Sequence, residues 1–246
     1  MSLRCAWLYY HTVHLIQGFV INLDNRKDRW IEASSQFSQF PFSIQRISAV
    51  NAVDIQREEP YVPGGVAATW RSHQKAMQAH IDSQAAYALI LEDDFLVRKD
   101  INRILNKIVD LECFDLVQLG YLSPSLLRRF IRYLVGMRDV FLKLLYRLHG
   151  IMNFDVLEKL VISEQKDVPL SIVLNDIQAG GQSYLVSRRF SEAAQEMNNP
   201  SFLSADGMLI ALSETRTFKV GRTRTNFIKQ SNSVSSVQQR FKQSDK

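Results

Sequence analysis

The run Tyr87-Ala88-Leu89-Ile90-Leu91-Glu92-Asp93-Asp94 decides the fold of this 246-residue chain. Its first five residues are apolar and favour a strand buried on both faces, which is typical of the centre of a parallel sheet. Three carboxylates then follow at the carboxyl end of that strand. Open α/β sheets bind their ligands at this edge. The run therefore predicts a central strand with an acidic end that faces a ligand.

Segments on both sides of this run alternate between strand and helix patterns. Upstream, apolar residues at 18–23 predict a first strand, and Asp24 or Asn25 can cap a helix that ends before Pro41. The alternation predicts one α/β domain with a mostly parallel central sheet flanked by helices, and excludes a β-sandwich or a helical bundle. We further expect strands at 42–50, 114–119 and 182–187, and helices at 66–81, 101–111 and 188–197.

Composition limits the classes of protein that fit. The chain is 46% hydrophobic and 22% charged, which supplies enough apolar surface for a large core and excludes an intrinsically disordered chain. Cys5 and Cys113 are the only cysteines, and their spacing matches neither a zinc site nor a redox motif. The cysteine usage favours the cytoplasm, where thiols stay reduced.

The chain divides into a domain with short flanking segments. We predict an N-terminal extension at 1–17, a domain at 18–230 and a polar, flexible tail at 231–246. The stretch 5–23 lacks charges, but its tyrosines, histidines and amides make a membrane anchor costly, and its last third fits a buried strand better. A helical, basic insertion at 122–170 interrupts the domain.

The first half of this insertion, 122–149, is amphipathic and cationic. It holds six lysines and arginines against one aspartate, and its apolar residues fall on one side of an ideal helix with a break near Gly136. Core packing of a helix pair is one interpretation. Peripheral contact with the anionic inner face of a membrane is the other, which the excess of basic residues favours. Nucleic-acid binding is not expected, because the segment lacks interleaved exposed aromatics and any known binding motif.

The acidic run Glu92-Asp93-Asp94 predicts a cation site, because adjacent carboxylates stay ionised cheaply only beside cations. Mn²⁺ and Mg²⁺ bind one or two protein carboxylates and take their remaining ligands from water and substrate phosphates. A solvated turn or a helix cap is the alternative for a short acidic run taken alone.

Five blocks, taken in order along the chain, carry a resemblance to a known family. They are Phe19-Val20-Ile21-Asn22-Leu23-Asp24 with Arg26, Asp28 and Arg29; Gly65-Val66-Ala67 with Ser72-His73; Ala88 to Asp94; Gly181 to Ser187 with Asp206; and Gln230 with Ser235-Ser236. Together they resemble the family 25 glycosyltransferases, which include lipooligosaccharide-biosynthesis enzymes and procollagen galactosyltransferases. The first three blocks are the most specific.

The resemblance implies a GT-A-like domain and a hexosyltransferase that uses a nucleotide sugar. It implies UDP-galactose as the donor, and a glycan or lipid-linked saccharide of lipopolysaccharide or another cell-surface glycan as the acceptor. Inversion at the anomeric carbon and a Mn²⁺ or Mg²⁺ cofactor are implied in the same way. The alternative is a non-catalytic relative that keeps the fold and binds a glycan or a membrane.

The resemblance also implies roles for individual residues. Asp94 and Asp93 are the expected metal ligands, and Asp206 is the expected general base for the acceptor hydroxyl. For Arg26 and Arg29 the alternative is a solvated helix start. For His73 it is a structural histidine, and for Asp206 a helix N-cap. Nucleotide contacts are expected from Asn22, Arg26, Arg29 and Glu92, and substrate contacts from His73 and Gln230.

The chain departs from the family pattern at three places. The changes at Gly65 and in the late histidine favour the non-catalytic alternative, and the change near Asp206 implies a different acceptor pocket. Gly65 stands where the family usually has an acidic residue, and the block around Asp206 lacks the aromatic residue that often follows. No histidine follows His149, although many GT-A enzymes use a late histidine as a metal ligand. Gln230, Asp206 or water must then complete a metal shell.

Overall fold

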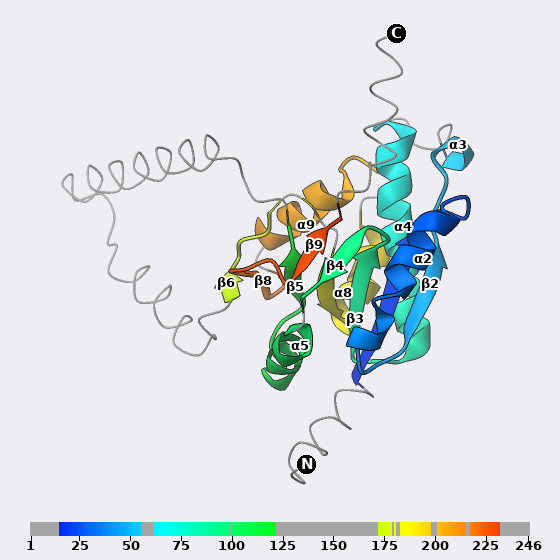
Figure 1. Cartoon of the computed structure of the whole chain (residues 1–246). Coiled ribbons are helices and arrows are strands. Elements are labelled where there is room, and N and C mark those ends of the chain that lie inside the picture. The colour runs from blue at the N-terminus through cyan, green and yellow to red at the C-terminus, as the bar shows by residue number, and fades with distance from the viewer. Residues whose placement is uncertain are drawn as a thin grey trace, which may run out of the picture. The chain divides into compact units, whose positions relative to one another are not determined.

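The computed structural model shows a mixed α/β fold (Figure 1). The structure describes residues 15–55, 62–98, 100–121, 172–178, 180, 183–197, 201–214 and 217–231. The amphipathic segment expected at 122–149 and most of the expected tail lie outside these ranges, so membrane contact through that segment stays a prediction. The chain divides into a unit of Met1–Tyr121 with Val173–Lys246 and a unit of Leu122–Ile172.

One seven-stranded sheet organises the described part of the chain. Its strands are β1 (Ile16–Asn22), β2 (Ile44–Ser48), β3 (Tyr87–Glu92), β5 (Leu116–Gly120), β6 (Ile172–Leu174), β7 (Ser183–Ser187) and β8 (Val220–Thr223), in the order β2-β1-β3-β7-β5-β8-β6. β1 is parallel to β2 and β3, and β5 is parallel to β8. Of the pairs that β1, β2, β3, β5, β7 and β8 make with one another in this sheet, only those of β7 with β3 and β5 are antiparallel. The sheet is mostly parallel, as predicted.

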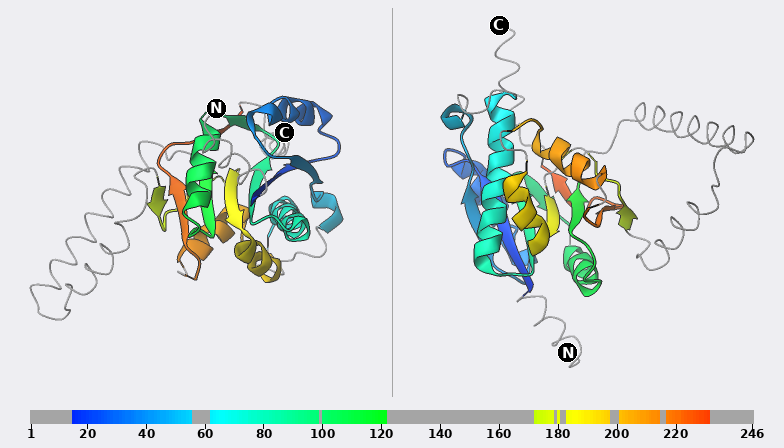
Figure 2. Two further views of the ribbon diagram at one scale, coloured as in Figure 1. Left: turned by 90° about the horizontal axis from the view of Figure 1, so that it is seen from below. Right: turned by 180° about the vertical axis from the view of Figure 1, so that it is seen from behind.

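Helices cover both faces of this sheet (Figure 2). α2 (Lys27–Ser34) and α5 (Ile101–Asp110) lie on one face, and α4 (Gly64–Ser83), α8 (Arg188–Glu196) and α9 (Ala205–Glu214) lie on the other. Because both faces are covered, β1, β3 and β7 are apolar along most of their length, with Val20, Ile90 and Val186 fully buried. Within the described ranges, no helix is both long and apolar enough to span a bilayer.

α4 packs on α8 partly through buried polar side chains. Gln74 donates to the carbonyl of Ala194 at 2.9 Å. His80 lies closer to the C-terminal end of α4. Its Nδ1 is 2.8 Å from the Ser191 hydroxyl, and its Nε2 is 3.0 Å from the Ala85 carbonyl. Burial lowers the pKa of His80 to about 4, so this histidine is neutral at physiological pH.

The segment after β1 differs from the sequence prediction at its helix start. α2 begins after Arg26, which makes no side-chain capping bond, so the predicted cap at Asp24 or Asn25 is wrong. The Asp24 carboxylate instead accepts from the Ser48 hydroxyl at 2.7 Å and pairs with Arg46 at 2.9 Å. α2 also ends early, and a separate 3₁₀ helix, η1 (Phe37–Gln39), and α3 (Ala52–Ile55) follow in the chain.

A second, two-stranded sheet brings the end of the described chain beside the turn after β3. β4 (Phe95–Val97) pairs antiparallel with β9 (Ile228–Gln230), and neither strand was predicted. β9 also passes close to Gly120 at the end of β5. A Cβ on Gly120 would collide with the Ile228 carbonyl and with the Ser183 hydroxyl. The close approach of β9 therefore requires glycine at this position.

We expect Gly120→Ala to lower the free energy of unfolding by about 3 kcal/mol, because the methyl group has no space and backbone must move. Gly65→Ala is the matched control. A Cβ on Gly65 meets nothing within 4 Å in an exposed part of α4, so this change should stabilise by up to about 1 kcal/mol. Urea denaturation of both variants measures the difference, and equal stability would show that β9 does not approach Gly120 closely.

Candidate functional site

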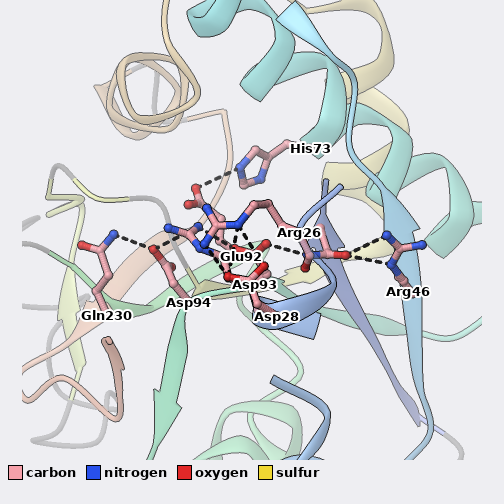
Figure 3. A network of polar contacts seen from close by, with 10 residues as sticks. Arg26, Asp28, Arg46, His73, Glu92, Asp93, Asp94 and Gln230 are labelled. Atoms are coloured by element: carbon pink, nitrogen blue, oxygen red, sulfur yellow. Dashed lines mark hydrogen bonds and ion pairs between the residues drawn. The ribbon is translucent and has the colours of Figure 1, made fainter. Parts of the chain in front are cut away.

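A cluster of polar side chains lies at the edge of the sheet where β1, β2 and β3 end (Figure 3). Asn22 at the end of β1 pairs in register with Ser48 of β2, and Ile21 pairs with Glu92 of β3. Because these strands are parallel, their carboxyl ends share one edge. The acidic run lies at the carboxyl end of a buried strand, as the sequence predicts.

Asn22 holds the first part of the cluster together. Its amide nitrogen donates to Asp93 Oδ2 at 2.7 Å and to the Arg26 carbonyl at 3.1 Å. Its amide oxygen accepts from Arg46 Nη2 at 2.7 Å and Nε at 2.9 Å. Since the side chain is buried and its polar atoms all have protein partners, Asn22 orients its neighbours. Its expected contact with a nucleotide stays a prediction.

Arg29 balances the charge of the acidic run. Its Nη1 donates to Asp93 Oδ1 at 2.9 Å and lies 3.8 Å from Asp94 Oδ2. Its side chain is only 9% exposed, so the alternative of a solvated helix start is wrong for this arginine. Loss of one partner from such a buried pair leaves an uncompensated charge, which is strongly destabilising.

Arg26 differs from Arg29 because it lies closer to solvent. It donates to the Asp28 carboxylate, with Nη2 and Oδ2 2.8 Å apart. This hydrogen bond lowers the pKa of Asp28 to about 2. A surface pair of this kind contributes little to stability, so an anionic ligand can replace Asp28 at small cost.

Asp94 has one carboxylate oxygen that is buried without a hydrogen-bond partner. Its Oδ2 accepts from the Gln230 amide at 2.9 Å, and its backbone carbonyl accepts from Ser231 N at 2.6 Å. Its Oδ1 is buried and has no hydrogen-bond partner. Burial, together with the charges of Glu92 and Asp93, raises the pKa of Asp94 to about 6 despite the Gln230 hydrogen bond and the Arg29 charge.

Glu92 points toward His73 on α4 (Figure 3). Its Oε1 lies 3.6 Å from His73 Nε2, and its side chain is one third exposed. The other ring nitrogen of His73 lies 2.6 Å from the hydroxyl of Tyr184 on β7. The structure therefore joins three side chains from β3, α4 and β7 in one polar chain.

Asp206 lies in the first turn of α9 but does not cap that helix. The cap is Ser204, whose hydroxyl accepts from Gly207 N at 3.0 Å, so the N-cap alternative for Asp206 is wrong. Asp206 Oδ2 instead accepts from Gly180 N at 2.7 Å. Its charge, like that of Glu92, contributes to the raised pKa of Tyr184, which shows that both carboxylates lie near this phenol.

The donor set of the site fits a divalent cation through one carboxylate. Within the described ranges, no group of three or more His, Cys, Asp or Glu side chains surrounds a common point. Asp93 uses both oxygens for contacts with Arg29 and Asn22, which disfavours it as a metal ligand, although its expected role stays a prediction. Oδ1 of Asp94, which is buried without a hydrogen-bond partner, suits Mn²⁺ or Mg²⁺. These ions complete their coordination shells with water and substrate oxygens.

Two site residues were missed by the sequence analysis. Arg46 lies in β2 and Tyr184 in β7, inside segments that were predicted correctly as strands. Nothing in a strand pattern tells a polar side chain that serves a site from one that faces solvent. Only the strand order, which sets β2 beside β1 and β7 beside β3, brings them to the cluster.

Comparisons with known proteins add no family assignment. No protein-family model matches the chain, and no curated protein matches it either. The chemistry of the cluster is therefore the basis for assigning a function.

The raised pKa of Asp94 predicts a pH-dependent cost to stability. The folded protein holds a proton on Asp94 up to about pH 6, whereas an unfolded chain releases it near pH 4, so the free energy of unfolding falls as pH rises between them. Relative to the unmodified protein, Asp94→Asn should therefore gain up to about 3 kcal/mol between pH 4 and pH 7.

Denaturation of the two proteins at each pH measures this difference. His80 has the opposite effect, because its lowered pKa makes stability fall as pH drops from about 6.5 to 4. His80 is common to both proteins and cancels in the difference. Asp100→Asn, which changes a half-exposed carboxylate, is the control, and its difference from the unmodified protein is the baseline. A difference for Asp94→Asn no larger than that baseline would contradict the assignment.

Proposed function

We propose that this chain is a metal-dependent glycosyltransferase with a GT-A-like domain, which transfers a hexose from a UDP-sugar to a saccharide acceptor. The observation that carries the proposal is the carboxylate of Asp94, which lies close to Arg29 at the carboxyl ends of β1, β2 and β3. One of its oxygens is buried without a hydrogen-bond partner. The five sequence blocks that resemble family 25 support UDP-galactose as donor and a glycan or lipid-linked saccharide as acceptor.

The donor diphosphate would lie beside Asp94, Arg29 and Arg26. Arg26 can exchange its exposed partner Asp28 for a phosphate oxygen, while Arg29 holds the Asp93 carboxylate in place. Asp94 Oδ1 would hold Mn²⁺ or Mg²⁺, and Glu92 would reach the donor or the metal through water. A divalent cation at this place supplies Lewis-acid stabilisation of the departing diphosphate.

Asp206 is the proposed general base. In a single displacement, the acceptor oxygen attacks the anomeric carbon, the bond from that carbon to the UDP oxygen breaks, and the acceptor proton passes to Asp206. This route inverts the anomeric centre. The hydrogen bond from Gly180 N holds one carboxylate oxygen of Asp206 in place, which supports a positioned base.

The second candidate is a binding protein that keeps the donor site but transfers no sugar. It is favoured by the lack of a three-residue metal group among the described side chains. Such a protein would bind UDP-galactose and leave it intact.

The purified protein should hydrolyse or transfer from UDP-galactose in a Mn²⁺-dependent way, and Asp94→Ala should abolish this activity because it removes the proposed ligand. Glu192→Gln, which changes an exposed carboxylate on α8, should leave activity unchanged. Release of UDP measures turnover, and thermal shift with UDP-galactose and Mn²⁺ measures binding. Full activity in Asp94→Ala would refute the metal site, and binding without turnover would support the second candidate.

Asp206→Asn should keep donor binding and lower transfer roughly a hundredfold, which is the usual contribution of a positioned base. The amide oxygen can still accept from Gly180 N, so the fold should persist. Turnover and melting temperature are measured together. A lower melting temperature with normal specific activity would assign Asp206 a structural role only.

A further inference from the structure

Two histidines on the inner face of α4 make similar contacts through one ring nitrogen. His73 and His80 are both buried, and each has a hydroxyl group at Nδ1, from Tyr184 and Ser191 respectively. They differ at Nε2. In His80 this nitrogen meets the Ala85 carbonyl at 3.0 Å, which completes a structural histidine. In His73 it is buried without a hydrogen-bond partner.

The open nitrogen of His73 faces Glu92. Their closest atoms are 3.6 Å apart, which is too long for a hydrogen bond. Glu92 is partly exposed at the ligand edge of the sheet, so its carboxylate is accessible to a ligand, whereas Nε2 of His73 is buried behind it. A ring nitrogen and a carboxylate that face each other without a hydrogen bond can both form hydrogen bonds to one ligand group placed beside them.

Tyr184 determines which atom of His73 carries the proton. Tyr184 is fully buried, and burial together with nearby carboxylate charge raises its pKa well above 10, so its hydroxyl keeps its hydrogen. The hydroxyl oxygen of Tyr184 lies 2.6 Å from His73 Nδ1, and the two rings stack with their centroids 5.6 Å apart. Because Nδ1 is the one hydrogen-bond partner of this hydroxyl among the described residues, we assign Nδ1 as the acceptor of its hydrogen. In neutral imidazole the proton is then on Nε2, facing Glu92.

We propose that His73 Nε2 and the Glu92 carboxylate together bind one hydroxyl group of the nucleotide sugar, and that Tyr184 is the positioning residue that orients His73. A hydroxyl group both accepts and donates, so it can take the hydrogen of Nε2 and give its own to Glu92. Phosphate oxygens cannot donate, and this pair would not favour them. The inference rests on the proposed function, because it names the part of the donor that this half of the site binds.

The first test measures which ring nitrogen of His73 carries the proton, and it needs no ligand. Two-bond ¹H–¹⁵N spectra of ring-labelled protein should show the His73 proton on Nε2 and a hydrogen bond at Nδ1, with His73→Gln used for assignment. Tyr184→Phe should move the Nδ1 signal toward that of an unbonded nitrogen. Ser191→Ala should do the same to His80 and leave His73 unchanged. A His73 protonated on Nδ1, or unaffected by Tyr184→Phe, would overturn the role of Tyr184.

The second test measures affinity for UDP-galactose and for UDP by calorimetry. Glu92→Gln should weaken UDP-galactose about tenfold or more, as loss of a charged hydrogen bond does, and Tyr184→Phe should weaken it by a smaller factor. Ser191→Ala is the matched control with unchanged affinity. A loss for UDP-galactose alone places the hydroxyl on the hexose, and an equal loss for UDP places it on the ribose.

The outcomes separate this inference from the proposed function. If the unmodified protein binds UDP-galactose and Glu92→Gln binds it equally well, the hydroxyl site is refuted and the glycosyltransferase proposal stands. If the unmodified protein binds no nucleotide sugar, the proposed function fails and the hydroxyl site fails with it. The spectra of His73 still decide whether Tyr184 orients the ring.

Discussion

Neutralisation of the charge at the end of β3 is the constraint on which the rest of the site depends. Three consecutive carboxylates lie at the carboxyl end of the buried strand β3, and each of them has a different environment. Asp93 pairs with buried Arg29, Asp94 receives an amide hydrogen from Gln230, and Glu92 turns toward His73 and solvent. Like charges this close raise one another's pKa, an effect that hydrogen bonds and positive partners oppose. The three partners come from three different elements, which ties α2, β9 and α4 to one edge.

Local sequence patterns were sufficient for most of the fold. Continuous apolar runs bounded by polar turns predicted β1 and β3, and helical spacing predicted α4, α5 and α8, each with ends close to those observed. The reversed direction of β7 and the pairing of β4 with β9 depend on contacts between distant segments, which no local pattern encodes. Asp24 illustrates the same limit, because it has the chemistry of a helix cap but bonds to β2 instead.

The sequence predicted the residues of the candidate site better than it predicted their contacts. Asn22, Arg29 and Asp94 do lie together with Gln230, which is distant in the chain. Their bonding differs from the expectation, because Asn22 and Asp93 are occupied with protein partners, whereas Asp94 keeps a buried oxygen without a hydrogen-bond partner. Sequence reasoning treats the two aspartates alike. Burial and the position of Arg29 distinguish them, and both are tertiary properties.

The two halves of the cluster differ in the chemistry that they offer. The half around Arg29 and Asp94 is charged, and it suits a diphosphate with its counter-cation. The half around His73 and Tyr184 has an imidazole nitrogen facing a carboxylate, which suits a hydroxyl group. Glu92 belongs to both, since it raises the pKa of Asp94 and faces His73. A nucleotide sugar carries its diphosphate directly beside hydroxyl-bearing rings, so one such molecule can satisfy both halves, whereas a simple phosphate or a simple sugar can satisfy only one.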